Sequence, residues 1–318
     1  MNILLTFDNN YTQYAGVTLT SFLMNNQGNH TIYVISDYIS EKNREMLSNI
    51  CTERGSDIHY IYIHAEDTKD FPVGKGTINP TLTIATYFRL FLADLLPNTI
   101  KKVLYIDCDI IVNDSLEDLW NTEFHEGKCI AGLEEMPDLA IDGCKRMGYP
   151  LEYSYINAGV ILFNLETLRK SYSVAKAIDF IKQHISNIRY HDQDVLNAML
   201  YDKKQFIDLK YNVMDTHLVR GAVFPKRYQD YRDSIFSPVI IHYTGYFKPW
   251  NIESNNPYTF KYFEYLENTP WKGTKPTRKL KTVKSFCVFK AKHFAKMFLD
   301  FIHVKNYRYL SFKQKMPL

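Results

Sequence analysis

The chain has 318 residues, of which 46% are hydrophobic and 15% aromatic, so it is long and apolar enough to bury a large core. Five cysteines without C-x-x-C spacing favour free thiols in a reducing compartment and argue against a disulfide framework or a zinc site. No apolar run approaches the roughly 20 residues of a membrane span, and a strand-like segment starts the chain, so we expect a cytoplasmic protein without a signal peptide.

The net charge of +3 is distributed unevenly along the chain. Residues 272–318 contain 13 Lys or Arg and one acid, a net charge of +12, which leaves −9 for residues 1–271. An acidic body followed by a basic tail indicates two parts with different roles. We therefore place a domain boundary between residues 271 and 272.

The opening of the chain alternates between strand and helix patterns. We expect strands at residues 3–7, 31–36 and 58–63, and helices between them at residues 14–25 and 41–55. Ser40 can cap the second helix and Gly55 can end it. The β-α-β-α-β order implies a parallel sheet of the doubly wound α/β class. No G-x-G-x-x-G motif follows the first strand and no P-loop motif occurs, which argues against a Rossmann dehydrogenase or a P-loop enzyme.

Candidate ligand-binding features follow the first strand and precede residue 95. Asp8 and Asn10 could recognise a base or ribose, although in isolation such residues more often form a turn. Residues 67–80 form a polar loop with two Pro and two Gly, long enough to cover a site as a lid. Residues 82–95 predict a helix in which Arg89 has apolar neighbours. A buried Arg89 needs a carboxylate or phosphate partner, and a side chain that reaches the surface is the equally weighted alternative.

The apolar run in residues 101–112 predicts a buried strand, which stops where two aspartates, Asp107 and Asp109, begin. In one extended strand, alternation would place both carboxylates on the same side and turn Cys108 away. Two converging carboxylates repel each other unless a cation lies between them, and oxygen ligands suit Mg²⁺ or Mn²⁺. The simpler interpretation is a strand that ends in an acidic turn, and an isolated D-x-D more often has that meaning.

Polar residues also mark the later elements. Ser115 predicts a capping box for a short helix, and strand patterns follow at residues 129–133 and 155–164, the latter with Asn157, Ala158 and Gly159 at its entry. Small residues there allow the backbone to approach a ligand closely.

The last predicted helix and strand carry further candidates. Asp192 opens a helix and in isolation is best interpreted as its N-cap. His242 ends a buried strand, where it becomes a candidate metal ligand only if carboxylates elsewhere share the ion. Gly245 and Lys248 follow and could offer N–H groups and an ammonium to a phosphate, although a lysine is ordinarily only solvated.

Taken together, the motifs resemble glycosyltransferase family 8, and within it the bacterial lipooligosaccharide and lipopolysaccharide galactosyl- and glucosyltransferases. The resemblance covers about residues 1–270 in the family's order. The matching motifs are Phe7-Asp8-Asn9-Asn10-Tyr11, Tyr87-Phe88-Arg89-Leu90, Leu104-Tyr105-Ile106-Asp107-Cys108-Asp109, Tyr155-Ile156-Asn157-Ala158-Gly159, His191-Asp192-Gln193-Asp194, and His242-Tyr243-Thr244-Gly245 with Lys248-Pro249-Trp250.

This resemblance implies a GT-A fold, a Rossmann-like mixed sheet flanked by helices, over residues 1–271. It implies that Asp107, Asp109 and His242 bind Mn²⁺, with Mg²⁺ as the alternative. It also implies a UDP-sugar donor, whose uridine, diphosphate and sugar would be bound by Phe7, Asp8, Asn10, Arg89, Asp107, Asn157, Ala158, Gly245 and Lys248. Asp192 and Gln193 would be the catalytic residues, with Asp192 and Arg89 fixing the sugar hydroxyls.

Members of the family retain the configuration of the anomeric carbon. Retention requires either a nucleophile on the β face or attack by the acceptor on the face from which UDP leaves. Gln193 holds the family position near the β face, but an amide is a poor nucleophile. We therefore favour front-face substitution, with Gln193 stabilising the positive charge that develops on the sugar.

Residues 284–305 have the pattern of a basic amphipathic helix. Its apolar side chains spread over one broad arc and most of its basic side chains lie opposite. Such a helix fits an interfacial membrane anchor that is attracted to anionic lipid. The alternative is a helix that packs on the catalytic domain with a basic solvent face. A nucleic-acid partner is not expected, since no recognition motif accompanies the charge.

The sequence thus predicts a cytoplasmic enzyme that is peripherally associated with the inner face of the cell membrane through residues 272–318. It would move a hexose, galactose or glucose, from a UDP-sugar to a lipopolysaccharide, a lipooligosaccharide or another cell-surface glycan acceptor that is linked to lipid. A transferase for a protein or soluble acceptor is the first alternative. A catalytically silent nucleotide-sugar-binding protein is the second, and the complete set of predicted metal and diphosphate ligands argues against it.

Overall fold

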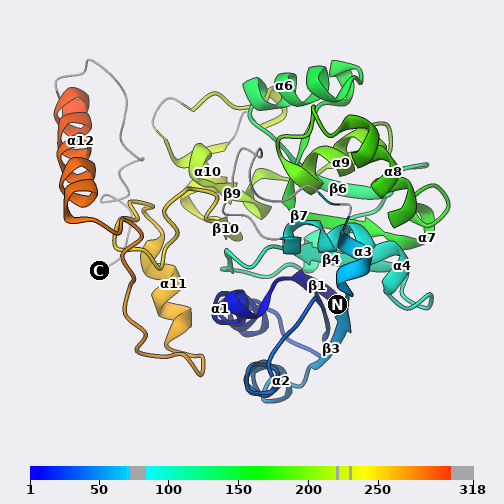
Figure 1. Ribbon diagram of the computed structural model, residues 1–318, viewed down its shortest axis with the longest axis horizontal. Coiled ribbons are helices and arrows are strands. Elements are labelled where there is room, and N and C mark those ends of the chain that lie inside the picture. The colour runs from blue at the N-terminus through cyan, green and yellow to red at the C-terminus, as the bar shows by residue number, and fades with distance from the viewer. Residues whose placement is uncertain (70, 72–83, 220–221, 229–230, 302–318) are drawn as a thin grey trace.

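Two sheets, one large and one small, form the centre of the computed structural model, which describes residues 1–69, 71, 84–219, 222–228 and 231–301 (Figure 1). The large sheet has the order β3-β2-β1-β4-β7-β6-β8 and the small one β5-β10-β9. The strands are β1 (Asn2–Thr6), β2 (Thr31–Ser36), β3 (Asp57–Tyr62), β4 (Lys102–Ile106), β5 (Ile110–Val112), β6 (Ile130–Glu134), β7 (Ile156–Asn164), β8 (Lys204–Phe206), β9 (Val213–Met214) and β10 (Ile240–His242).

Helices surround the sheets. The α-helices are α1 (Thr12–Asn25), α2 (Glu41–Thr52), α3 (Ala65–Thr68), α4 (Leu92–Leu95), α5 (Glu117–Trp120), α6 (Pro137–Met147), α7 (Leu165–Leu168), α8 (Val174–His184), α9 (His191–Met199), α10 (Tyr231–Phe236), α11 (Thr259–Leu266) and α12 (Val283–Phe301). The 3₁₀ helices are η1 (Asn9–Tyr11), η2 (Ile84–Phe91), η3 (Leu151–Tyr153), η4 (Leu209–Tyr211), η5 (Asp215–Leu218) and η6 (Lys226–Tyr228).

The large sheet is mixed. Strands β3, β2, β1 and β4 run parallel, as the opening β-α-β-α-β pattern predicted, whereas β7 runs antiparallel to both β4 and β6. Alternate side chains of each strand enter different cores. Ile3 and Leu5 of β1 pack with α1 and α2 on one face, and Leu4 packs with η2, α8 and α9 on the other. Figure 1 shows these two helical layers on either side of the sheet. The predicted helix-flanked α/β fold is confirmed.

Most local predictions for the opening segment are correct. Strand β2 has the predicted bounds, and the Ser40 side chain caps α2 by accepting a hydrogen bond from the Asn43 N–H. Gly55 adopts a positive φ of 68° just beyond α2. The capping box at Ser115 is wrong: the N-cap of α5 is Leu116, and the Ser115 hydroxyl accepts a hydrogen bond from the N–H of Glu117.

The strand predicted within residues 101–112 ends at the carboxylates, as expected, but Asp107 and Asp109 do not lie in one extended segment. Strand β4 ends at Ile106, and β5 starts at Ile110 in the other sheet, antiparallel to β10. Residues 107–109 form the turn between the two sheets. Backbone hydrogen bonds hold this turn on both sides, from Asp107 N to the Gly159 carbonyl and from Tyr243 N to the Asp109 carbonyl. The partners that end β4 come from distant β7 and β10, so alternation within one strand could not reveal them.

Two other predictions differ in part from the structure. The helix expected over residues 82–95 is a 3₁₀ helix, η2, followed by one turn of α-helix, α4. Residues 82 and 83 lie outside the described residues, as does most of the predicted lid at residues 67–80, so the lid stays a prediction.

The basic C-terminal segment has two described parts. Residues 272–281 run along the body of the protein, and α12 extends away from it at the edge of the molecule (Figure 1). Helix α12 covers most of the predicted amphipathic helix, whose end lies beyond the described residues. Within the described part of the chain, no helix has the length and apolar content that crossing a membrane requires. The domain boundary after residue 271 stays a prediction.

Candidate active site

A cavity of about 540 Å³ opens where β1 and β4 end. This is the edge at which open α/β sheets bind ligands, because the loops after neighbouring strands meet there. Seven of the residues singled out from the sequence line it: Phe7, Asp8, Arg89, Asp107, Asp109, Gly245 and Lys248.

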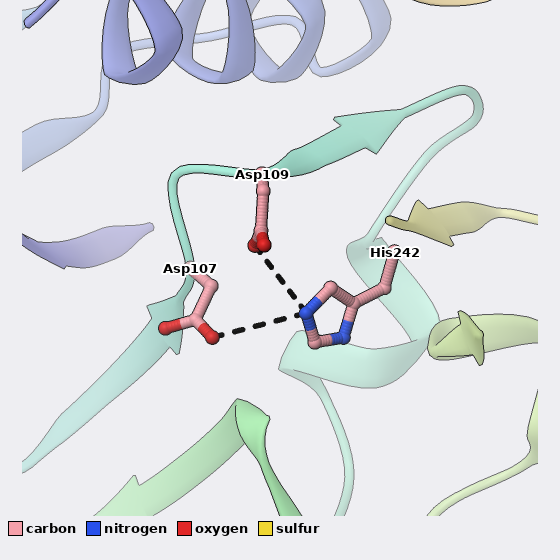
Figure 2. A group of neighbouring side chains, drawn as sticks. All are labelled: Asp107, Asp109 and His242. Carbon is pink, nitrogen blue, oxygen red and sulfur yellow. Dashed lines mark ion pairs between the residues drawn. The ribbon is translucent and has the colours of Figure 1, made fainter. Parts of the chain in front are cut away.

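Asp107 and Asp109, which line the cavity, converge with His242, which is not among its lining residues. Figure 2 shows the three side chains directed at one another. Nε2 of His242 lies 3.8 Å from an oxygen of Asp107 and 3.3 Å from an oxygen of Asp109. One potential ligand atom from each of the three residues lies within 4.8 Å of the others. Because the side chain of His242 is 5% exposed and those of the aspartates 26% and 15%, the ligand set is half-enclosed but open towards the cavity.

The other ring nitrogen of His242 has a partner that fixes the ring. Nδ1 lies 2.8 Å from Oδ1 of buried Asn212, an acceptor, so Nδ1 carries the proton. This tautomer leaves the lone pair of Nε2 directed at the two aspartates, as in metal sites where a residue behind the ligand orients it. Two carboxylates and a neutral imidazole fit Mn²⁺ or a similar divalent ion.

Lys248 adds a positive charge beside this group. Its Nζ lies 2.8 Å from an Asp109 oxygen and donates a hydrogen bond of 2.6 Å to the Tyr243 carbonyl. Burial by itself would raise the pKa of Asp109, but the positive charge of Lys248 opposes burial and helps to hold that pKa well below its usual range. Asp109 is therefore a carboxylate at every pH near neutrality, as a metal ligand must be.

Arg89 is buried and joins two carboxylates. Its guanidinium lies 2.7 Å from an Asp107 oxygen and 2.9 Å from an Asp192 oxygen, and it donates a hydrogen bond to the Ala158 carbonyl. The Arg89 side chain is 7% exposed, so the alternative of a side chain that reaches the surface is wrong. The ring of Tyr105 lies 4.1 Å from the guanidinium carbon. The cation is thus held in one position between the candidate metal ligands and α9.

Asp192 is not the N-cap of α9. The N-cap is Tyr190, and Asp192 lies in the first turn with its carboxylate pointed at Arg89 and at the hydroxyl of Thr86, which donates a 2.7 Å hydrogen bond. Burial raises the pKa of Asp192 to about 6, although Arg89 opposes the shift. The side chain of Asp192 does not line the cavity; Thr86 and Arg89 lie in the wall in front of it.

Gln193 and Asn157 form a polar layer behind Arg89. Oε1 of Gln193 accepts hydrogen bonds from the Ala158 N–H at 2.9 Å and from Nδ2 of Asn157 at 3.3 Å. Oδ1 of Asn157 accepts from Asn212, the residue that orients His242. Asn157, Ala158 and Gln193 are therefore joined to the candidate metal group, but none of them lines the cavity.

The comparisons with known proteins agree with this arrangement. The model for the family described as Glycosyl transferase family 8 matches residues 2–254, most of the chain. The chain belongs to glycosyl transferase family 8.

Relatives of this family 8 glycosyltransferase include enzymes of known activity. It is 27% identical over 297 residues to a lipopolysaccharide 1,2-glucosyltransferase of Escherichia coli K12, a match that covers 92% of this chain and 84% of the relative. It is 28% identical to a lipopolysaccharide 1,3-galactosyltransferase of Salmonella typhimurium, covering 85% and 79%. Its fold matches a galactosyltransferase, LgtC, solved with donor and acceptor sugar analogues, at a TM-score of 0.75 and 26% identity, covering 85% of this chain and 96% of that one. The expected GT-A fold is confirmed.

In this glycosyltransferase, the other residues predicted to bind the donor either bond to neighbouring residues or lie outside the cavity lining. Asp8 lines the cavity, but its carboxylate also accepts a hydrogen bond from the Asn10 N–H and caps η1, so the turn interpretation is correct for this pair. Asn10 is exposed and does not line the cavity. The N–H of Gly245, expected to be available to a phosphate, donates to a carboxylate oxygen of Asp215 at 2.9 Å.

Several residues of the site were missed by sequence reasoning. The cavity has an aromatic wall in which Tyr14 and Trp250 stack at 3.7 Å, with Tyr11 at their edge. Glu135 is buried and accepts a 2.8 Å hydrogen bond from Asn157, and burial raises its pKa. Tyr11 and Trp250 stood within quoted motifs and could have been proposed, whereas Glu135, Asn212 and Asp215 had no local signal, since their partners are distant in sequence.

The basic segment after residue 271 also contributes to the cavity, which the proposed division into two domains did not anticipate. The contributing residues are Thr277, Arg278, Lys279 and Lys281.

Proposed function

We propose that this family 8 glycosyltransferase is a metal-dependent, retaining hexosyltransferase that transfers galactose or glucose from a UDP-sugar to a lipid-linked cell-surface glycan. The observation that carries the proposal is the convergence of His242 with Asp107, Asp109 and Lys248, the last three of which line the cavity. Carboxylate, imidazole and ammonium groups at one place suit a nucleoside diphosphate and its divalent ion.

Asp107, Asp109 and His242 would hold Mn²⁺, or Mg²⁺ as the alternative. The imidazole in the set favours Mn²⁺, because Mg²⁺ prefers oxygen ligands. When bound, the ion would supply Lewis-acid neutralisation of the departing diphosphate. Lys248 would add a fixed positive charge at the same position. Asp109, already a carboxylate, needs no proton loss before it binds the ion, and Asn212 orients the His242 ring towards it.

The rest of the cavity suits the other parts of the donor. The wall of Tyr11, Tyr14 and Trp250 offers ring faces and edges to a uracil base, and Phe7 and Asp8 lie beside it. Asn10 would contribute through its turn with Asp8 rather than by its own side chain. Gly245 would allow close approach of the diphosphate, because it has no side chain.

Arg89 and Asp192 would position the sugar. Arg89 reaches the cavity, and ionised Asp192 orients it from behind through their ion pair. The amide oxygen of Gln193 already accepts hydrogen bonds from Ala158 and Asn157, which argues against a nucleophilic role and is consistent with front-face substitution.

The acceptor proposal rests on the relatives and on the C-terminal helix. The two lipopolysaccharide glycosyltransferases named above match over most of this chain. On α12, Phe294 is 74% exposed and Phe298 is 55% exposed, which favours a membrane-facing helix over one packed on the catalytic domain. We propose that α12 and the basic residues around it hold the enzyme on the cytoplasmic, anionic face of the membrane.

Donor use is tested with a panel of UDP-sugars, with UDP release measured in Mn²⁺ and then in EDTA. The proposal expects release from UDP-galactose or UDP-glucose that EDTA abolishes. Asp109→Asn should lose it, whereas exposed Asp118→Asn should keep it. Release that continues in EDTA would contradict the metal dependence, and binding without release would favour the silent sugar-binding alternative.

Membrane association is tested by sedimentation with vesicles. The wild-type chain should sediment with anionic but not with neutral vesicles, and a Phe294→Asp/Phe298→Asp variant should remain in the supernatant. Exposed Phe260→Asp on α11 is the matched control. A double variant that still sediments would contradict the membrane role of α12.

A further inference from the structure

The first residues of the basic C-terminal segment are attached to the loop that follows β10. The N–H of Thr277 donates to the Trp250 carbonyl at 2.8 Å, and the N–H of Ile252 donates to the Thr277 carbonyl at 3.0 Å. Beyond this pair, the N–H groups of Lys279 and Leu280 donate to the carboxylate of Glu253, at 3.2 and 3.0 Å. We call residues 277–281 the basic strap.

Glu253, which accepts these hydrogen bonds, is buried, with an exposed fraction of 1%. Two N–H groups bound to one buried carboxylate fix the backbone direction at Lys279 and Leu280, and hydrogen bonds to a charged acceptor are among the stronger ones. The strap is therefore a built part of the cavity wall, and Arg278, Lys279 and Lys281 line the cavity from it.

Within the strap, Lys279 is directed towards the diphosphate side of the cavity. Its Nζ donates a 2.7 Å hydrogen bond to the Tyr246 carbonyl and lies 3.9 Å from the centre of the Tyr246 ring. Tyr246 lies between Gly245 and Lys248 in the loop that would receive the diphosphate. Burial and then the positive charge of Lys248 lower the pKa of Lys279, as expected for two ammonium groups near each other.

The two lysines differ in their partners. Lys248 is paired with Asp109, whereas Lys279 forms no ion pair with a carboxylate anywhere in the described part of the chain. Two cations that face one cavity repel each other, and an anion between them removes that repulsion. The diphosphate of a UDP-sugar carries two negative charges, and Asp107 and Asp109 already offset the charge of a divalent ion that they would hold, so a second ammonium has a counter-charge there.

We propose that Lys279 binds the diphosphate of the donor, so that the start of the C-terminal segment is part of the donor site. This inference rests on the proposed function, since it takes a nucleoside diphosphate as the ligand. The basic segment then has two roles: its strap completes the donor cavity, and α12 faces outward. The strap contacts the start of α12, since the guanidinium carbon of Arg278 lies 4.6 Å from the centre of the Phe286 ring. The loop after β10 also contacts α12, since the ring centres of Phe247 and Phe289 lie 4.9 Å apart.

The experiment measures ligand binding by the full-length protein. Isothermal titration in Mn²⁺ buffer gives the affinity for UDP. Ligand-observed NMR in metal-free buffer gives the affinity for uridine, which has no diphosphate to meet the ion. The variants are Lys279→Gln and Lys279→Arg, and Lys284→Gln, exposed in the same segment, is the matched control. Thermal unfolding of each variant checks that the fold is kept.

Lys279→Gln should weaken UDP binding about tenfold, as expected for one lost charge-assisted contact, and leave uridine binding unchanged. Lys279→Arg should keep most of the affinity for UDP, and Lys284→Gln all of it. Equal UDP affinity of Lys279→Gln and wild type would overturn the inference, and so would an equal loss for UDP and uridine. A wild-type chain that binds no UDP would instead overturn the proposed function, and this inference with it.

Discussion

The backbone of Gly159 lies directly against the imidazole of His242. A β-carbon at position 159 would come within 2.3 Å of Cε1 and 2.9 Å of Nδ1 of that ring. The carbonyl of the same residue accepts a hydrogen bond from the N–H of Asp107. Gly159 thus contacts both halves of the candidate metal group. The sequence indicated a close approach at Asn157-Ala158-Gly159, and in the structure the group approached is a candidate metal ligand.

Gly159→Ala should therefore damage the metal group selectively. The added methyl pushes the His242 ring away from Asn212 and Asp109, and we expect Mn²⁺ affinity to fall about 10- to 100-fold, as when a group that orients a metal ligand is lost. Titration of free Mn²⁺ by electron paramagnetic resonance measures the affinity directly.

The control for this substitution is Gly127→Ala. Its β-carbon would meet nothing within 4 Å, but its φ of 75° is strained for alanine, so it should lower stability by about 1 kcal/mol without changing Mn²⁺ affinity. Unchanged Mn²⁺ affinity in Gly159→Ala would show that His242 is not part of the metal group.

Arg89→Met should be among the most destabilising single substitutions in the chain. It leaves the buried carboxylate of Asp192 and one oxygen of Asp107 without their cation, and breaking a buried pair in this way costs about 3–5 kcal/mol. Urea unfolding measures the change. Adding Asp192→Asn to the variant should restore part of the stability, because it removes the unpaired charge. Arg54→Met, which removes a pair with exposed Glu53, should cost less than about 1 kcal/mol.

The buried His217 should make stability depend on pH. Its Nδ1 accepts a hydrogen bond from the Met214 N–H, so the folded chain holds the ring neutral, and burial, with a smaller effect of His242, lowers its pKa to about 3 from an ordinary 6.5. Below pH 6.5 the unfolded chain binds a proton that the folded chain does not. The free energy of unfolding should therefore fall by about 1.4 kcal/mol per pH unit as pH drops towards 3, with no contribution from this group above pH 6.5.

Urea unfolding of wild type and His217→Gln at pH 6.5 and pH 5 isolates this contribution. The wild type should lose about 2 kcal/mol more than the variant between the two pH values, whatever the variant's absolute stability. His125→Gln, at an exposed position, should follow the wild type. Parallel pH dependence of wild type and His217→Gln would contradict the assignment.

Glu135 should act on transfer by positioning other residues. Its carboxylate accepts a hydrogen bond from Asn157, which in turn donates to Gln193. Glu135→Gln can turn an amide N–H towards Asn157 and disturb this layer, so we expect kcat to fall about tenfold while the KM for the donor and the Mn²⁺ affinity change little. Steady-state kinetics separate the two parameters, and Glu126→Gln, in an exposed turn, should match the wild type. A rise in KM alone would place Glu135 in donor binding instead.

The sequence by itself determined the elements whose signals are local. The strands β1 and β2, the cap at Ser40 and the helical character of the tail all follow from periodicity and from single residues at element ends. It also indicated Asp107, Asp109 and His242 as candidate ligands, because strand ends of an α/β sheet are where ligand-binding side chains gather. The aspartates follow the end of β4, as predicted, but they lie in a turn between two sheets, so alternation along an extended segment does not explain why they converge.

Only the tertiary structure decided which residues hold the candidate metal ligands in place and which residues complete the cavity around them. Asn212 orients His242, Glu253 fixes the basic strap, and the strap brings Lys279 beside Lys248. Each of these pairs joins residues about 25 or more positions apart, in segments whose own patterns carry no trace of the partner. Periodicity reports which face of an element is buried, whereas a polar contact between two loops depends on where the whole chain places their ends.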